Sequence, residues 1–149
     1  MWALCQEMLS PQARQRAEYI GEVPYSEVSK YVSRAGLCVF PSYAEALPLS
    51  WLEVMACGKP VVVYDIGWAR EVVEHGSTGL LVKRGDIDAL AEAMLKFLRD
   101  PSLASPLGVC ARSQVEAKFS VRTMAKASID WYEQVLERAE CNSRKNRSH

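Results

Sequence analysis

The sequence predicts an α/β protein in which a partial Rossmann-like parallel sheet is flanked by helices. Short runs of apolar and β-branched residues alternate along the chain with longer stretches of helical periodicity. These runs are apolar throughout, which is typical of strands buried on both faces of a parallel sheet. Ligands of such sheets bind beyond the carboxyl ends of the strands. A binding site is therefore expected in the loops that follow the strands.

Four strands are predicted, at 17–23, 37–40, 60–64 and 80–82. The helices are predicted over 3–16, 25–35, 48–57, 69–75, 86–99, 102–117 and 121–139. Doubly wound nucleotide-binding domains usually have about five or six strands. The sheet is therefore expected to lack its first strands.

One domain is predicted over residues 1–139, followed by a disordered basic tail over 140–149. The length of 149 residues matches one ordinary domain, and 49% hydrophobic with 24% charged residues is typical of globular proteins. The last nine residues, CNSRKNRSH, offer no large apolar side chain to bury. Their composition therefore indicates disorder.

Charge and hydropathy argue against several functions. The 18 basic and 18 acidic side chains cancel, so there is no electrostatic case for nucleic-acid binding. No apolar run reaches the roughly 20 residues of a membrane span, and a signal peptide is not indicated. The five cysteines form no C-x-x-C pair, and only two histidines are present. We therefore expect a cytoplasmic protein with reduced thiols and no metal site.

The segment 41–53 contains the strongest candidate site. Pro48 suits the first position of a helix, because its φ is fixed and its missing N–H would have no partner there. Leu47 would then be the N-cap, and leucine has no side-chain acceptor. The amides of Leu49 and Ser50 are therefore expected to lack a local partner. Free amides at a helix start form a favourable site for a phosphate.

Two glutamates flank this helix start. Glu45 precedes the helix, and Glu53 lies about one and a half turns into it. Carboxylates accept hydrogen bonds from hydroxyl groups. Glu45 could therefore hold a transferred sugar, and Glu53 could hold the ribose of a nucleotide. A glutamate near a helix start also complements the helix dipole, and for these residues taken alone that structural role is the commoner explanation.

A longer pattern resembles the signature of family 4 glycosyltransferases, which have the GT-B fold. It begins with VFPS at 39–42, Glu45 and Glu53 with seven residues between them, and MACGKPVV at 55–62. The pattern continues with DIG at 65–67, EVV at 71–73, GSTGLLV at 76–82 and GD at 85–86. The resemblance covers roughly residues 19–100. It implies the C-terminal, donor-binding domain of a GT-B enzyme.

The resemblance implies a retaining glycosyltransferase of polysaccharide biosynthesis that moves a hexosyl group from a nucleotide-diphosphate sugar without a metal or other cofactor. Glu45 would contact the transferred sugar and is the catalytic candidate, while Glu53 would contact the ribose. The residues implied to bind the donor are Glu45, Ala46, Leu47, Leu49, Ser50, Glu53 and, near the base, Val23.

The sequence departs from the family pattern in two places. The common Gly-Phe-Gly after the first glutamate is here Ala46-Leu47-Pro48, and the proline removes one amide. Trp68 stands where a second glycine is frequent, which would alter the outer wall of the sugar pocket. Arg70 and Lys83 follow strands, but solvated surface cations are the simpler interpretation of them.

Family members also have an acceptor-binding domain and a basic pair that contacts the phosphates, and this chain begins after both. Cations stabilise the charge that develops on a leaving diphosphate. We therefore expect no sugar transfer by the chain alone, with the acceptor held by a missing domain or a partner subunit.

Two alternatives stay open. One is a fragment of a nucleotide-sugar 2-epimerase-like isomerase, although Pro41-Ser42-Tyr43-Ala44 does not resemble the Asp-Ser-Gly-Gly loop of that group. The other is a non-catalytic nucleotide-sugar-binding or interaction module. Such a module could form a homo-oligomer through its open sheet edge.

Overall fold

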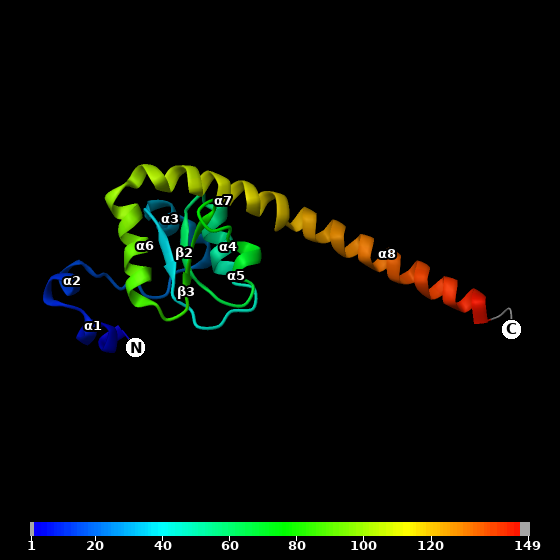
Figure 1. The fold of residues 1–149 in the computed structure, drawn as a ribbon, viewed down its shortest axis with the longest axis horizontal. Helices are drawn as coiled ribbons and strands as arrows, with labels where there is room; N and C mark the ends of the chain where they lie inside the picture. Colours follow the sequence, from blue (N-terminus) through cyan, green and yellow to red (C-terminus); the bar gives the residue numbers. More distant parts are fainter. Residues whose placement is uncertain (1, 147–149) are drawn as a thin grey trace.

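The computed structural model describes residues 2–146, and side-chain environments are described for residues 2–139. An α/β body forms most of the structure, and the last helix projects away from it (Figure 1). The sheet contains three parallel strands in the order β1-β2-β3. These strands are β1 (Cys38–Phe40), β2 (Val61–Asp65) and β3 (Gly79–Lys83). The predicted parallel α/β sheet is confirmed.

Helices cover the sheet on both sides. In chain order they are α1 (Trp2–Met8), α2 (Pro11–Arg16), α3 (Tyr25–Arg34), α4 (Leu49–Ala56), α5 (Ala69–Val72), α6 (Ile87–Arg99), the 3-10 helix η1 (Pro101–Leu103), α7 (Ala104–Lys118) and α8 (Val121–Asn146). Figure 1 shows α6 on one side of the strands and α4 with α5 on the other. Within residues 2–146, no helix has the length and hydropathy of a membrane span.

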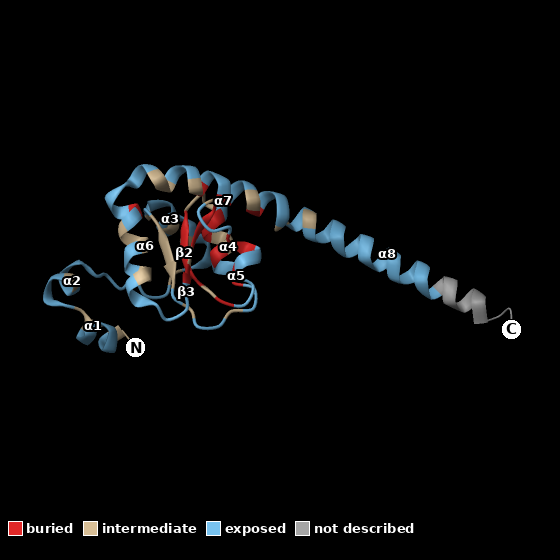
Figure 2. Ribbon diagram, viewed as in Figure 1, coloured by how far each residue is buried: buried red, intermediate tan, exposed pale blue. Residues whose placement is uncertain are grey.

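The core is centred on β2. Val61, Val62 and Val63 are fully buried, and Figure 2 shows this strand as a continuous buried segment between the helices. Burial on both faces explains why the strand is apolar at successive positions. Trp51 and Met55 of α4 are also fully buried in the same cluster. This packing fixes α4 against the sheet.

Two expectations near the amino end are wrong. Residues 17–23 form no strand, and residues 17–22 are exposed. A strand needs a neighbour for its backbone groups, and none lies beside this segment in the described sheet. The helix predicted over 3–16 is divided, because Ser10 caps α2 through the Ala13 N–H at 3.2 Å and Pro11 lacks an N–H for a continuing helix.

The predicted disordered tail needs correction over 140–146. Helix α8 continues through these residues to Asn146, while 147–149 lie outside the described residues. No glycine or proline interrupts residues 121–146, and lysine and arginine are good helix formers. A polar composition therefore did not end the helix. The domain boundary at 139 stays a prediction.

The two edges of the sheet differ in their free backbone groups. On β3, the Leu81 N–H donates to Nδ1 of His75 at 3.0 Å, so a side chain occupies this edge position. On β1, no further strand is paired within the described sheet. Association through an open edge would therefore use β1. Whether the chain forms such an oligomer stays a prediction.

Candidate functional site

The candidate site begins where the loop after β1 leads into α4. Pro48 is the N-cap, with φ −77° and ψ 96°, and the helix begins at Leu49. The prediction that Leu47 is the cap is therefore wrong by one residue. The N–H of the N-cap and that of the first helical residue both lack a partner within the helix. Proline, which has no N–H, suits both positions, so the sequence did not distinguish between them.

The start of α4 leaves two backbone donors free. The Trp51 N–H donates to the Pro48 carbonyl at 3.1 Å, and no side chain caps the helix. Among the described residues, the amides of Leu49 and Ser50 have no hydrogen-bond acceptor. The positive end of the α4 dipole lies at the same place. This end of the helix can bind an anion through its backbone.

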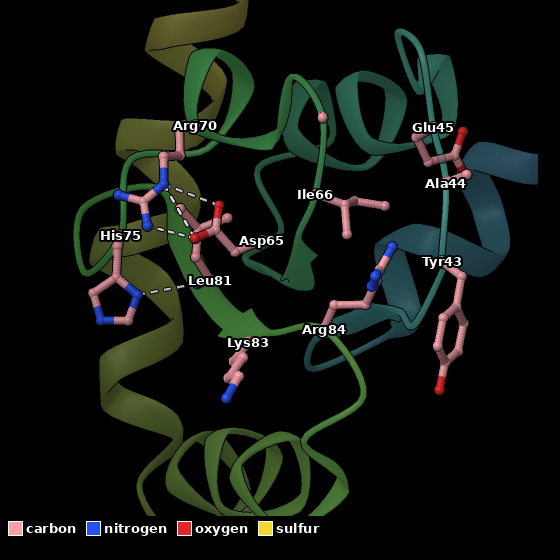
Figure 3. A pocket seen from close by; sticks show the side chains of 11 residues that line it. Tyr43, Ala44, Glu45, Asp65, Ile66, Arg70, His75, Leu81, Lys83 and Arg84 are labelled. Carbon is pink, nitrogen blue, oxygen red and sulfur yellow. Dashed lines mark hydrogen bonds and ion pairs between the residues drawn. The ribbon is translucent and has the colours of Figure 1, made fainter.

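Glu45 lines a cavity of about 920 Å³ at the carboxyl ends of the strands. Figure 3 shows that the cavity is built by the loop after β1, the loop after β2 and the end of β3. Glu45 is half-buried and forms no ion pair with any described residue. A Cβ on Gly67, whose φ is +45°, would lie 2.9 Å from the Glu45 carbonyl oxygen. Glycine at 67 therefore permits the loop after β2 to pack against the backbone of Glu45.

Glu53 lies on α4 and lines a second cavity of about 310 Å³. Its Oε1 accepts a hydrogen bond from the hydroxyl of Tyr25 at 2.9 Å. This bond and the negative charge of Glu53 both favour the protonated phenol, so they raise the pKa of Tyr25. Ser26 also lines this cavity, whereas Val23, the residue predicted to lie near a base, is not among its lining residues.

The structure places the two predicted carboxylates in different cavities, with the start of α4 between them in the chain. The other predicted donor-binding residues of this segment are all exposed, and they are Ala46, Leu47, Leu49 and Ser50. Glu53 follows Leu49 by four residues, which is roughly 6 Å along the helix axis.

The larger cavity also contains charged residues that sequence analysis treated as surface cations or did not consider. Nε of Arg70 donates to both carboxylate oxygens of Asp65 at 3.0 and 3.1 Å, and Nη2 donates to Asp65 as well. Asp65 therefore raises the pKa of Arg70. Lys83 and Arg84 form no ion pair with any residue in the part of the chain whose side chains are described.

The Tyr25–Glu53 bond and the Arg70–Asp65 pair are tertiary features. Tyr25 and Glu53 are 28 positions apart and meet because α3 packs beside α4. No periodicity in either segment indicates the contact. Asp65 and Arg70 are only five residues apart, at the end of β2 and in α5. This short separation was the signal in the sequence that could have indicated their ion pair.

Comparison with known proteins identifies the family. The family described as glycosyl transferases group 1 matches residues 3–114. The chain belongs to the group 1 glycosyltransferases. This result confirms the resemblance to family 4 enzymes of GT-B fold, and the three-stranded sheet with its helices matches the C-terminal domain of that fold.

Individual relatives of this glycosyltransferase chain agree with the family match. The α-maltose-1-phosphate synthase of Mycolicibacterium smegmatis is 36% identical in an alignment of length 131 that covers 83% of this chain and 34% of the relative. The glycogen synthase of Mycobacterium tuberculosis is 32% identical in an alignment of length 132 that covers 85% of this chain and 32% of the relative. The chain thus spans about a third of the length of these relatives.

Solved glycosyltransferase structures superpose well on the chain. The sucrose-phosphate synthase of Thermosynechococcus elongatus gives a TM-score of 0.82 at 34% identity, covering 91% of this chain and 33% of that protein. Anabaena HepE in complex with UDP gives 0.81 at 25% identity, covering 89% and 36%. HepE has also been solved in complex with UDP-glucose, with a TM-score of 0.78.

Proposed function

We propose that this glycosyltransferase domain binds a nucleotide-diphosphate sugar for retaining transfer of a hexosyl group to an acceptor held by another domain or subunit. The observation that carries the proposal is the arrangement around α4. A carboxylate precedes the helix, two free amides lie at its start, and a second carboxylate follows about one turn later. A nucleotide sugar offers the complementary groups in the same order: sugar hydroxyls, diphosphate and ribose hydroxyls.

Each part of the site has a separate role in this proposal. Glu45 accepts hydrogen bonds from the transferred sugar and is the catalytic candidate, because it contacts the group that reacts. The amides of Leu49 and Ser50, with the backbone around Ala46 and Leu47, bind the diphosphate. Glu53 accepts hydrogen bonds from the ribose. Val23 is assigned the weakest role, because the residue beside the smaller cavity is Tyr25 rather than Val23.

Transfer moves charge toward the diphosphate. The bond from the anomeric carbon to the phosphate oxygen breaks, the acceptor oxygen bonds to that carbon, and the acceptor hydroxyl passes its proton to the departing diphosphate oxygen. The nucleoside diphosphate leaves with the electron pair of the broken bond. Free amides and the positive end of α4 stabilise this developing charge and involve no metal ion.

The free donors at the start of α4 are backbone amides, and no described side chain caps this helix. We therefore propose that cations from another domain or subunit complete the site, and that the 149-residue chain alone does not turn over. The family match favours transfer over the isomerase alternative. The solved complexes of HepE with UDP and UDP-glucose support a nucleotide sugar as the ligand. Steady sugar transfer by the purified chain would contradict the proposal that another domain or subunit must complete the site.

Replacing Glu45 with alanine should abolish the preference for a nucleotide sugar over its nucleoside diphosphate. Hydrogen bonds to a charged carboxylate contribute about 1.5–3 kcal/mol, which is roughly ten- to a hundredfold in affinity. Isothermal titration calorimetry with both ligands measures the difference. The matched control is Glu74→Ala, which removes an exposed carboxylate that lines neither cavity. An unchanged preference in Glu45→Ala would refute the sugar-binding role.

A further inference from the structure

We propose that Lys83 and Arg84 form a binding site for the phosphate group of a phosphorylated sugar, in the same cavity as Glu45. That this site lies beside a donor sugar rests on the proposed function. That it binds a sugar phosphate does not. The site is separate from the diphosphate position at the start of α4. It would let the enzyme hold a second, anionic sugar next to the group that is transferred.

The charges of the cavity are not balanced by the protein. Three cations, Arg70, Lys83 and Arg84, line the cavity together with two carboxylates, Glu45 and Asp65. Asp65 is fully engaged with Arg70, and Glu45 makes no ion pair with the described residues. Lys83 and Arg84 therefore retain their charges without a carboxylate within 4.0 Å in the described part of the chain. Two unpaired cations match the charge of a phosphate monoester.

The end of β3 brings these two cations to one cavity. Lys83 is the last residue of the strand, and neighbouring strand residues normally point to opposite faces. The strand ends there, and Gly85 follows with φ +80°, which reverses the chain. Figure 3 shows Arg84 extending toward the space between Tyr43 and Ile66, with Lys83 farther along the rim. Both residues are exposed, and their long side chains can turn toward one anion.

The rest of the cavity suits a sugar. Its volume of about 920 Å³ lies within the range of small-molecule sites, which is on the order of 300–1,000 Å³. The carboxylate of Glu45 can accept hydrogen bonds from hydroxyl groups. Tyr43 packs edge-on against Tyr64, with ring centroids 5.8 Å apart, and gives the cavity an aromatic wall. Cations for a phosphate therefore stand beside acceptors and an aromatic surface for a sugar ring.

Binding of a sugar phosphate to the complete chain tests the proposal. The probes are glucose 6-phosphate, glucose and inorganic phosphate, each measured by calorimetry and by shifts of backbone amide NMR signals. Glucose 6-phosphate should bind about tenfold or more tightly than either of the other two, because each of them lacks half of the contacts. Its amide shifts should centre on residues 81–85. Equal binding of glucose, or shifts centred on α3 and α4, would overturn the proposal.

Double substitutions distinguish specific binding at Lys83 and Arg84 from nonspecific attraction of the phosphate to surface cations. The double variant Lys83→Ala/Arg84→Ala should reduce glucose 6-phosphate binding to the level of glucose. The matched control Arg122→Ala/Lys126→Ala removes two exposed cations of α8 and should leave binding unchanged. Lys83→Arg should retain most of the affinity, because it keeps the charge. Loss in the control as large as in the test variant would contradict a specific site.

A nucleoside diphosphate separates this inference from the proposed function. UDP, GDP or ADP should bind in the presence of saturating glucose 6-phosphate, because the two phosphate positions differ. Direct competition would overturn the inference and place the sugar phosphate at α4. Binding of glucose 6-phosphate without any nucleotide binding would support the inference and count against the proposed function.

Discussion

Replacing Glu53 with alanine should weaken binding of the nucleoside diphosphate by about ten- to a hundredfold, the effect of losing a charge-assisted contact of roughly 1.5–3 kcal/mol. The carboxylate of Glu53 has one oxygen engaged by Tyr25 at 2.9 Å, and the proposed function assigns the other oxygen to the ribose hydroxyls. Removing the side chain eliminates these acceptors. Calorimetric titration with UDP, GDP and ADP, each against the native chain and the variant, measures the loss.

Two matched variants show whether that loss comes from the ribose contact. Tyr25→Phe removes the hydrogen bond to Glu53 but keeps the carboxylate, so it should cost much less affinity than Glu53→Ala. Glu27→Ala removes a half-buried acid of α3 that is paired with Lys30 and does not line the cavity of Glu53, so it should have no effect. Unchanged affinities for all three nucleotides in Glu53→Ala would show that the ribose assignment is wrong.

Replacing Gly108 with alanine should reduce the free energy of unfolding by about 1–3 kcal/mol, the usual cost of overpacking. A Cβ at this position of α7 would lie 2.0 Å from the backbone oxygen of Gly58. Gly58 follows the end of α4 with φ +70°. The close approach of the Gly58 and Gly108 backbones therefore holds α7 against the end of α4. Alanine favours helix by roughly 0.5–1 kcal/mol over glycine, which offsets part of the cost.

The measurement is thermal or urea unfolding followed by circular dichroism. In a chain of this size, each kcal/mol lowers Tm by roughly 2–4 °C. Gly36→Ala is the matched control, because an added Cβ there meets nothing within 4 Å and φ is not positive. If Gly108→Ala were as stable as Gly36→Ala, α7 would not be held to α4 through this contact.

The features that could be predicted from the sequence depend on local pattern. The strand around Val61–Asp65 is recognisable because burial on both faces requires a continuous apolar run. The free amides of α4 were predicted because Leu47, the expected cap, offers no capping side chain. Pro48, the observed cap, offers none either, so the amides are free as predicted. The helix predicted over 86–99 is observed as α6, and Asp86 caps it by accepting the Ala89 N–H at 2.9 Å.

Features that depend on a partner were not predictable. Residues 17–23 have apolar and aromatic side chains that fit a strand, but no described strand lies beside them to accept their backbone bonds. The contact between Tyr25 and Glu53 depends on the packing of α3 against α4. The cavity containing Lys83 and Arg84 forms only when three loops converge. Lys83 was therefore interpreted as a solvated surface cation, and Arg84 was not considered.

Titration of the complete chain with a panel of UDP-, GDP- and ADP-sugars tests the central claim most directly. The donor-site proposal predicts saturable binding of at least one nucleotide sugar, with amide NMR shifts at the start of α4 and near both Glu45 and Glu53. Such shifts would show one ligand extending across the two cavities. Binding of none of the panel, or binding without any shift at Leu49 and Ser50, would contradict the proposed donor site.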